Sequence, residues 1–84
     1  MNTAETLLAQ TLAANAAANY ADIDRSADAR AERARHHAYL AHKNRIEGLP
    51  NPPADSLEAR LIQHHIDGDI SAAQLVAITR LLPR

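Results

Sequence analysis

Five histidines are the first residues of this 84-residue chain that could carry chemistry, because imidazole is a common metal ligand and a base near neutral pH. Two ligands on one helix must lie three or four residues apart to face one metal ion, and no pair of these histidines has that spacing. Adjacent histidines point about 100° apart, so each doublet offers one imidazole to a shared site. We therefore expect no metal site, and histidines that face solvent or a partner. They are His36, His37, His42, His64 and His65.

Other signatures of a catalytic site are missing from the sequence. There is no glycine-rich phosphate loop, no cysteine that could act as a nucleophile or zinc ligand, and no serine with an evident base. A chain of this length has room for one small domain, so we expect a protein that is not an enzyme and uses no cofactor. Protonation of all five histidines would raise the formal net charge from -1 by five units to +4, so the charge responds to mildly acidic pH.

Glu47 stands where local physics does not favour an acidic residue. It precedes Gly48 at the predicted C-terminal end of a helix, where the negative end of the helix dipole destabilises a carboxylate by roughly 0.3 kcal/mol. Lys43, four residues earlier, lies on the same face, whereas Arg45 lies on another side. An exposed pair of Lys43 with Glu47 would contribute only about 0.3 kcal/mol. Glu47 is therefore either half of this exposed pair or a carboxylate that awaits an arginine on another molecule.

The composition predicts helices around a thin core. Alanine supplies 19 of the hydrophobic residues, and the others are ten Leu, six Ile, two Tyr, one Val and one Met. Alanine has the highest helix propensity, whereas one Val and two Tyr cannot fill the face of a sheet. We therefore expect an all-α protein of three or four helices. The absence of cysteine, of a signal-peptide pattern and of an apolar run of about 18 residues predicts a cytoplasmic protein.

Caps and breakers divide the chain into four segments. Residues 1–22 form an Ala-rich N-terminal helical extension, which Asn2 caps and which would be marginal alone because it has few large side chains. Residues 23–48 form a long helix that Asp22 or Asp24 could cap. A narrow face of this helix would let another surface approach closely, and it consists of Ala27, Ala31, Ala34, Ala38 and Ala41.

Gly48 and the prolines behind it mark the clearest boundary. Glycine adopts the left-handed conformation that ends helices, and the Pro-rich turn of residues 49–54 cannot continue one. Residues 55–84 then form a C-terminal helical hairpin. Its predicted capping pairs are Asp55 with Glu58 and Ser71 with Gln74, and its corner contains Gly68 and a buried Ile70.

From Leu40 to Leu82, about half of the chain, the sequence resembles the VbhA-like antitoxins of bacterial Fic toxin-antitoxin pairs. The resemblance rests on the order and approximate spacing of a short motif, a Pro-rich turn, an amphipathic helix, and a corner that leads into a short terminal helix. The motif is Arg45, Ile46, Glu47, Gly48 and Leu49, and the corner is Asp67, Gly68, Asp69, Ile70 and Ser71.

In that family, the helix that ends at Glu-Gly lies beside the nucleotide site of the Fic enzyme, and its Glu pairs with an arginine that would otherwise hold the γ-phosphate of ATP. The resemblance implies an antitoxin that binds a Fic-domain adenylyltransferase toxin and blocks productive ATP binding through Glu47. Gly48 would turn the backbone away, and Arg45 and Ile46 belong to the same inhibitory motif. The family has Ser or Thr four residues before the Glu, where this chain has Lys43.

Two other functions fit parts of the sequence. Residues 25–45 contain six basic residues against two acidic ones, whereas both ends of the chain are acidic. This pattern allows a nucleic-acid-binding or autoregulatory protein, although a pI near 6.5 and a single aromatic residue in the basic stretch favour a solvated helix face. A structural helical adaptor is the third possibility. The arginines that would contact nucleic acid are Arg25, Arg30, Arg33 and Arg35.

Overall fold

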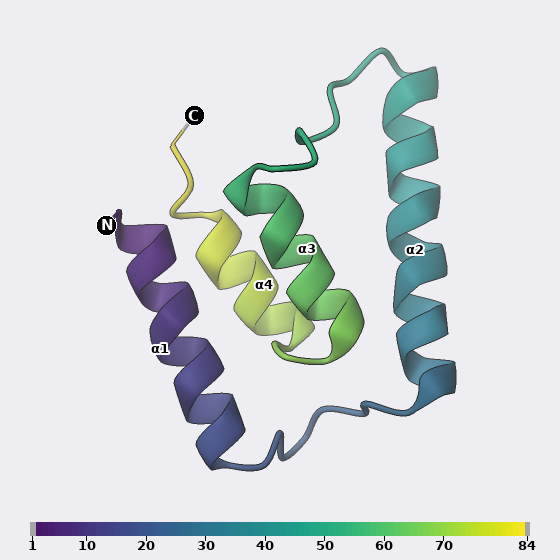
Figure 1. Ribbon diagram of the computed structural model, residues 1–84. Helices are drawn as coiled ribbons and strands as arrows, with labels where there is room; N and C mark the ends of the chain where they lie inside the picture. The colour runs from purple at the N-terminus through teal and green to yellow at the C-terminus, as the bar shows by residue number, and fades with distance from the viewer. Residues whose placement is uncertain (1, 84) are drawn as a thin grey trace.

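A computed structural model describes residues 2–83 of the chain, and within that range it contains four helices and no strand (Figure 1). The helices are α1 (Thr3–Ala17), α2 (Ala27–Ile46), α3 (Leu57–Asp67) and α4 (Ala72–Thr79). The expected all-α class with three or four helices is therefore confirmed. Met1, the first residue of the predicted segment 1–22, and Arg84, the last residue of the predicted segment 55–84, lie outside the described residues.

The helices are not arranged in the order of the sequence. Helix α4 packs against α1 on one side and α3 on the other, and α2 packs against the far side of α3 (Figure 1). The molecule is consequently flat, with principal extents of 40 × 34 × 19 Å. Helix α2 thus lies at one edge and has a single helical neighbour with which it makes extensive contact.

The hydrophobic core lies between α1, α3 and α4. Its buried side chains are Ala4, Leu8, Leu61, Ile70 and Ile78, and the leucines that pack against them are Leu7, Leu12, Leu57, Leu75 and Leu82. Helix α1 is therefore a part of the core, in contrast to the N-terminal extension expected from its alanine content. Burial of a leucine contributes about 1.5–3 kcal/mol, so even one or two such side chains are enough to fix a helix that is marginal alone.

Polar contacts add to the attachment of α1. The Asn2 side chain caps the helix as predicted, because its Oδ1 accepts the backbone N–H of Glu5 at 2.8 Å. At the other end, the Asn15 amide donates to the backbone oxygen of Asp69 and to the Gln74 side chain, both at 2.8 Å. Asn15 therefore ties the end of α1 to the corner that precedes α4. Sequence analysis did not identify this role, because it depends on which helix lies beside α1.

Helices α2 and α3 begin later than predicted, and each is capped by a serine. Helix α2 begins at Ala27, because the Ser26 hydroxyl accepts the N–H of Ala29 at 3.2 Å and the Asp24 carboxylate accepts the N–H of Ser26 at 2.9 Å. Asp22 has a φ of 70°, which is left-handed and not helical. The prediction that Asp22 or Asp24 caps a helix over 23–48 is therefore wrong.

The predicted capping pair of Asp55 with Glu58 is also wrong. Helix α3 begins at Leu57, and the Ser56 hydroxyl accepts the N–H of Ala59 at 3.2 Å. Before the helix, the N–H and the hydroxyl of Ser56 both donate to the backbone oxygen of Pro53, at 3.0 and 2.6 Å. This turn uses Asp55 as one of its central residues, so the helix can start only after it.

The corner between α3 and α4 follows its prediction closely. Gly68 ends α3 in the left-handed conformation with a φ of 83°, and Ile70 is 1% exposed. Ser71 and Gln74 form the reciprocal capping box at the start of α4. A Cβ atom on residue 68 would lie 2.8 Å from the Cγ of Arg25, so glycine is required there for space as well as for conformation.

Helix α2 supplies no buried residue. The four alanines expected to let a surface approach, Ala27, Ala31, Ala34 and Ala38, are exposed, and Ala41 is half-buried. The side chains of α2 that bond to α3 are polar ones, Arg33 and His37. The helix that carries the candidate site is therefore attached by polar contacts at the edge of a core formed by the other three helices.

Replacement of Leu8 by alanine tests the place of α1 in the core. Leu8 is 6% exposed, so Leu8→Ala should lower the free energy of unfolding by roughly 2–5 kcal/mol through lost burial and a residual cavity. Leu81→Ala is the matched control, because Leu81 is 42% exposed and its loss should change the same quantity by less than about 1 kcal/mol. Urea denaturation followed by circular dichroism measures both. If the two variants lower the free energy of unfolding equally, α1 is not part of the core.

Candidate functional site

The site predicted from the sequence lies at the C-terminal end of α2. Glu47 is the C-cap residue, and Gly48 follows in the left-handed conformation with a φ of 72°. The N–H of Leu49 donates to the oxygen of Asn44 at 2.8 Å, and the N–H of Gly48 donates to the oxygen of Arg45 at 3.3 Å. These two bonds form the Schellman motif, in which a left-handed residue ends a helix. The predicted helix end at Gly48 is confirmed.

The side chain of Asn51 fixes the exit from this helix. Its amide donates to the oxygen of Ala41 at 3.0 Å, and its oxygen accepts from the amide of Asn44 at 3.0 Å. The neighbouring residues Pro50 and Pro52 have no backbone N–H, so the turn is poor in donors and Asn51 provides one. Asn44 and Asn51 therefore set the direction of the chain behind Glu47. Sequence analysis missed both, although an asparagine between two prolines was a usable signal.

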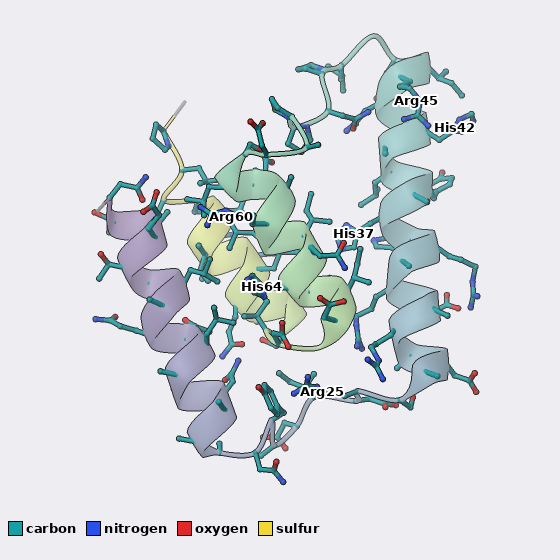
Figure 2. The ribbon with its side chains drawn as sticks, in the orientation of Figure 1. Arg25, His37, His42, Arg45, Arg60 and His64 are labelled. Carbon is teal, nitrogen blue, oxygen red and sulfur yellow. The ribbon has the colours of Figure 1, made fainter. Side chains whose placement is uncertain are left out.

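Glu47 forms only a weak contact within the chain. One of its carboxylate oxygens, Oε1, lies 3.8 Å from the Nζ of Lys43, and the two side chains are 46% and 55% exposed. Ion pairs of this kind on a helix surface contribute about 0.3–0.5 kcal/mol, so the carboxylate can exchange Lys43 for a better partner at little cost. His42 and Arg45 lie on the same end of α2 (Figure 2). We call Lys43, Arg45, Ile46, Glu47 and Gly48 the helix-end site.

Large apolar side chains are exposed beside Glu47. Ile46 is 73% exposed and Leu49 is 52% exposed. Two turns earlier, Tyr39 and Leu40 are exposed as well. Of the large hydrophobic residues that are exposed within residues 2–83, only Val76 and Leu81 lie elsewhere. Such a concentration on one short segment is typical of a surface that contacts another protein.

A groove of about 590 Å³ lies between the C-terminal half of α2 and the pair of α3 and α4. Its apolar walls include Leu40, Ile62, Leu75 and Val76. The groove offers contact area for apolar side chains of another molecule. No group of three or more metal-ligating side chains is close enough to hold a metal ion in the part of the chain that the structure describes.

Two of the five histidines contact each other, which differs from the expectation that all face solvent or a partner. The Nε2 of His37 on α2 lies 2.7 Å from the Nδ1 of His65 on α3. Burial lowers the pKa of both imidazoles. The nearby His36 adds to this effect at His37, and His37, Arg33 and His36 add to it at His65. His37 lies on the side of α2 that faces α3 (Figure 2).

His64 faces a carboxylate, because its Nδ1 lies 2.8 Å from Oδ2 of Asp69. His36 and His42 are exposed, as expected. The adjacent pairs therefore divide their roles: one member of each doublet joins the contact between α2 and α3, and the other points elsewhere. Periodicity alone predicts this divergence but not which helix each imidazole meets.

Most of the basic stretch is engaged within the chain. The guanidinium of Arg25 lies over the ring of Tyr20, 3.6 Å from its centroid, and 3.3 Å from the carboxylate of Asp69 (Figure 2). The Arg33 guanidinium donates to the backbone oxygens of Ile66 and Asp24, at 3.1 and 2.8 Å. A third arginine, Arg35, pairs with a glutamate on its own helix. Among Arg25, Arg30, Arg33 and Arg35, only Arg30 has no hydrogen bond or ion pair from its side chain within residues 2–83.

Comparison of the chain with protein-family models, with curated proteins and with solved structures finds no significant match. None of the helices in the described range is long and apolar enough to cross a membrane. The geometry of the helix-end site is therefore the main guide to function.

Substitution of Gly48 tests whether the left-handed helix end sets the position of Glu47. A Cβ atom on residue 48 would meet no other atom within 4 Å, so the strain expected from a Cβ here is that of the left-handed backbone. Gly48→Val should cost about 1–2 kcal/mol at this position and shift the amide resonances of residues 44–51. Gly48→Asn is the control, because asparagine tolerates the left-handed conformation. If valine and asparagine give the same spectra and stability, the conformational requirement is absent.

Proposed function

We propose that the chain is an antitoxin that binds a Fic-domain adenylyltransferase toxin and blocks productive ATP binding through Glu47. The observation that carries the proposal is the exposed carboxylate at the end of α2, where the helix dipole disfavours it and Lys43 is a weak partner 3.8 Å away. Fold stability gives no reason for an acid at this position. A cationic group on another molecule would give a reason for an acid here, since it would pair with a carboxylate that is already held at the tip of a helix.

In this proposal α2 is the inhibitory helix, and α3 and α4 are the C-terminal hairpin that supports it. The exposed Tyr39, Leu40, Ile46 and Leu49 supply the apolar area that holds the toxin. Their removal from water would contribute about 25 cal/mol for each Å² of apolar surface. Affinity and inhibition are therefore separable, because the apolar residues provide the first and Glu47 the second. The absence of cysteine is in keeping with action in the cytoplasm.

Inhibition follows from competition for an arginine. A guanidinium binds a carboxylate and a phosphate with the same two-pronged geometry, so Glu47 and the γ-phosphate of ATP exclude each other at one arginine of the toxin. AMP transfer needs the target hydroxyl to attack the α-phosphorus while pyrophosphate leaves, with the two oxygens roughly in line. A triphosphate that cannot reach its arginine does not present the α-phosphorus in this way, and the reaction stops.

Lys43 is the residue of the helix-end site at which this chain differs from the family pattern. The antitoxins that the sequence resembles have Ser or Thr at this position, whereas here the Lys43 ammonium lies on the same face as Glu47. When Glu47 pairs with the toxin's arginine, Lys43 must move away from this positive charge or find an acidic residue on the toxin. The side chain is 55% exposed, so it can move at little cost. We therefore expect Lys43 to face either an acidic group of the cognate toxin or solvent in the complex.

A nucleic-acid-binding function has less support. Three of the four arginines that would contact phosphates bond instead to groups of the chain itself, as with Arg25 and Asp69. Phosphate contacts would weaken binding steeply between about 50 and about 200 mM salt, whereas a packed apolar interface would not. A structural adaptor that uses the groove beside α2 is the remaining alternative, and it requires no role for Glu47.

Replacement of Glu47 by glycine separates the two alternatives that involve a protein partner. Because most of the affinity comes from apolar contacts, Glu47→Gly should still form the complex with the cognate toxin. Inhibition of labelled AMP transfer should nevertheless fall by a factor of tens to thousands, since loss of one member of a desolvated charge pair costs about 2–5 kcal/mol. Glu32→Gln is the control, because Glu32 is an exposed carboxylate on the same helix that also pairs with a basic residue.

Complex formation is measured by co-purification, and transfer is followed on the target or on the toxin itself. Glu32→Gln should inhibit as well as the parent protein. A Glu47→Gly complex that forms and remains fully inhibited would show that steric cover, and not the carboxylate, blocks the toxin. An adaptor would give that result or would not bind the toxin at all.

A further inference from the structure

Helix α2 is joined to α3 by few direct bonds. In the described part of the chain, its side chains bond to α3 through the Arg33 guanidinium, which donates to the oxygen of Ile66 at 3.1 Å, and through His37 with His65 at 2.7 Å. The loops on either side keep the helix close, through Asp24 at its start and Asn51 at its end. No buried apolar side chain of α2 reinforces these bonds. Without the histidine contact, the Arg33 bond is the direct side-chain hydrogen bond that remains between the two helices in this part of the chain.

The geometry of the two imidazoles makes their contact dependent on protonation. At 2.7 Å, one ring must donate an N–H and the other must accept it with a lone pair. A single added proton leaves this bond intact, because an imidazolium still donates to a neutral ring. A second proton leaves two N–H groups facing each other, and two positive charges beside the Arg33 guanidinium. The contact cannot persist in that state.

The charged surroundings do not compensate for the second proton. The nearest groups that share the cavity or helix face with the pair are cationic or titrate in the same range, as with Arg33 and His36. Two of the nearby acids have partners, since Asp24 accepts the N–H of Ser26, and Asp69 lies against His64 and Arg25. The other charged groups around the pair are Asp22 on the loop before α2, Glu58 on α3 and Arg80 after α4, and none of them is a cause of the lowered pKa of either imidazole.

We propose that the contact between His37 and His65 is a proton-operated latch, which holds α2 on α3 at neutral pH and releases it when both imidazoles are protonated. The inference rests on the structure of the free chain and does not depend on the proposed function. Its consequence is that mild acid frees the helix that carries the helix-end site, while α1, α3 and α4 stay packed.

The direction of the pH dependence follows from the pKa of each ring in the two states. Burial lowers the pKa of His37 and of His65 when α2 is docked, whereas the released rings regain the ordinary value of about 6.5. The released state therefore binds protons at a higher pH than the docked state does. Docking is at full strength above about pH 6.5 and is lost as the pH falls below it. For each extra proton that the released state takes up, the ratio of released to docked molecules rises by at most about tenfold per pH unit as the pH falls.

The absence of cysteine allows two spin labels to be placed where they disturb little. Ala13→Cys on α1 and Ala38→Cys on α2 are suitable, because both alanines are exposed. Electron–electron double resonance should give one narrow distance at about pH 7.5 and a longer, broader distribution at about pH 5.0, on the two sides of the ordinary imidazole pKa of about 6.5. Circular dichroism should show the same helix content at both pH values.

A pair of substitutions and a control assign the change to the latch. His37→Gln with His65→Gln should give the same distance at both pH values, because amides bond to each other without titrating. His42→Gln, on an exposed position of the same helix, should keep the parent's response. In the parent, nuclear magnetic resonance should show the His37 and His65 rings titrating below the ordinary imidazole pKa of about 6.5, together with shifts of the α2 amides.

Three results would overturn the proposal. The first is an unchanged distance in the parent between the two pH values, and the second is a loss of helix content at the lower pH, which would mean general unfolding. The third is titration of both His37 and His65 at the ordinary imidazole pKa of about 6.5, which remains decisive even if the glutamine pair fails to dock.

Discussion

The supply of large apolar side chains decides which helices of this protein are held firmly. The buried residues, with Leu61 completely enclosed among them, lie between α1, α3 and α4 or at the corner that joins the last two. Helix α2 buries none of its apolar residues, and its bonds to the rest of the chain are made by Arg33, His37 and the turn around Asn51. The edge formed by α2 is consequently held by polar contacts that can change, whereas α1, α3 and α4 are held together by buried apolar side chains.

This division suits a helix whose task lies outside its own chain. The proposed inhibitory group, Glu47, is at the far end of α2, and the exposed Ile46 and Leu49 lie beside it. A helix held by polar contacts can adjust to a partner surface without loss of the core, because the bonds it gives up are each worth only about 1–3 kcal/mol. The Schellman end at Gly48 and the Asn51 bonds keep the local geometry of the site during such an adjustment.

Local features of the sequence predicted local features of the structure. Gly48, Gly68 and the Ser71–Gln74 capping box act within a few residues of themselves, and they are where the sequence placed them. The starts of α2 and α3 were mispredicted because aspartate and serine cap helices about equally well, and the choice depends on the turn before each helix. The core role of α1 and the pairing of His37 with His65 depend on which helices become neighbours. Periodicity within one segment does not contain that information.

The central claim, that three helices form the core and α2 is attached at its edge, is tested most directly by native-state hydrogen exchange. In the free protein at neutral pH, the amides of α2 should exchange through a local opening, with little dependence on denaturant. Amides in the middle of α1, α3 and α4 should exchange only through global unfolding and should share one free energy. Equal protection of α2 and α3 would contradict the account, and so would an α1 that exchanges faster than α2.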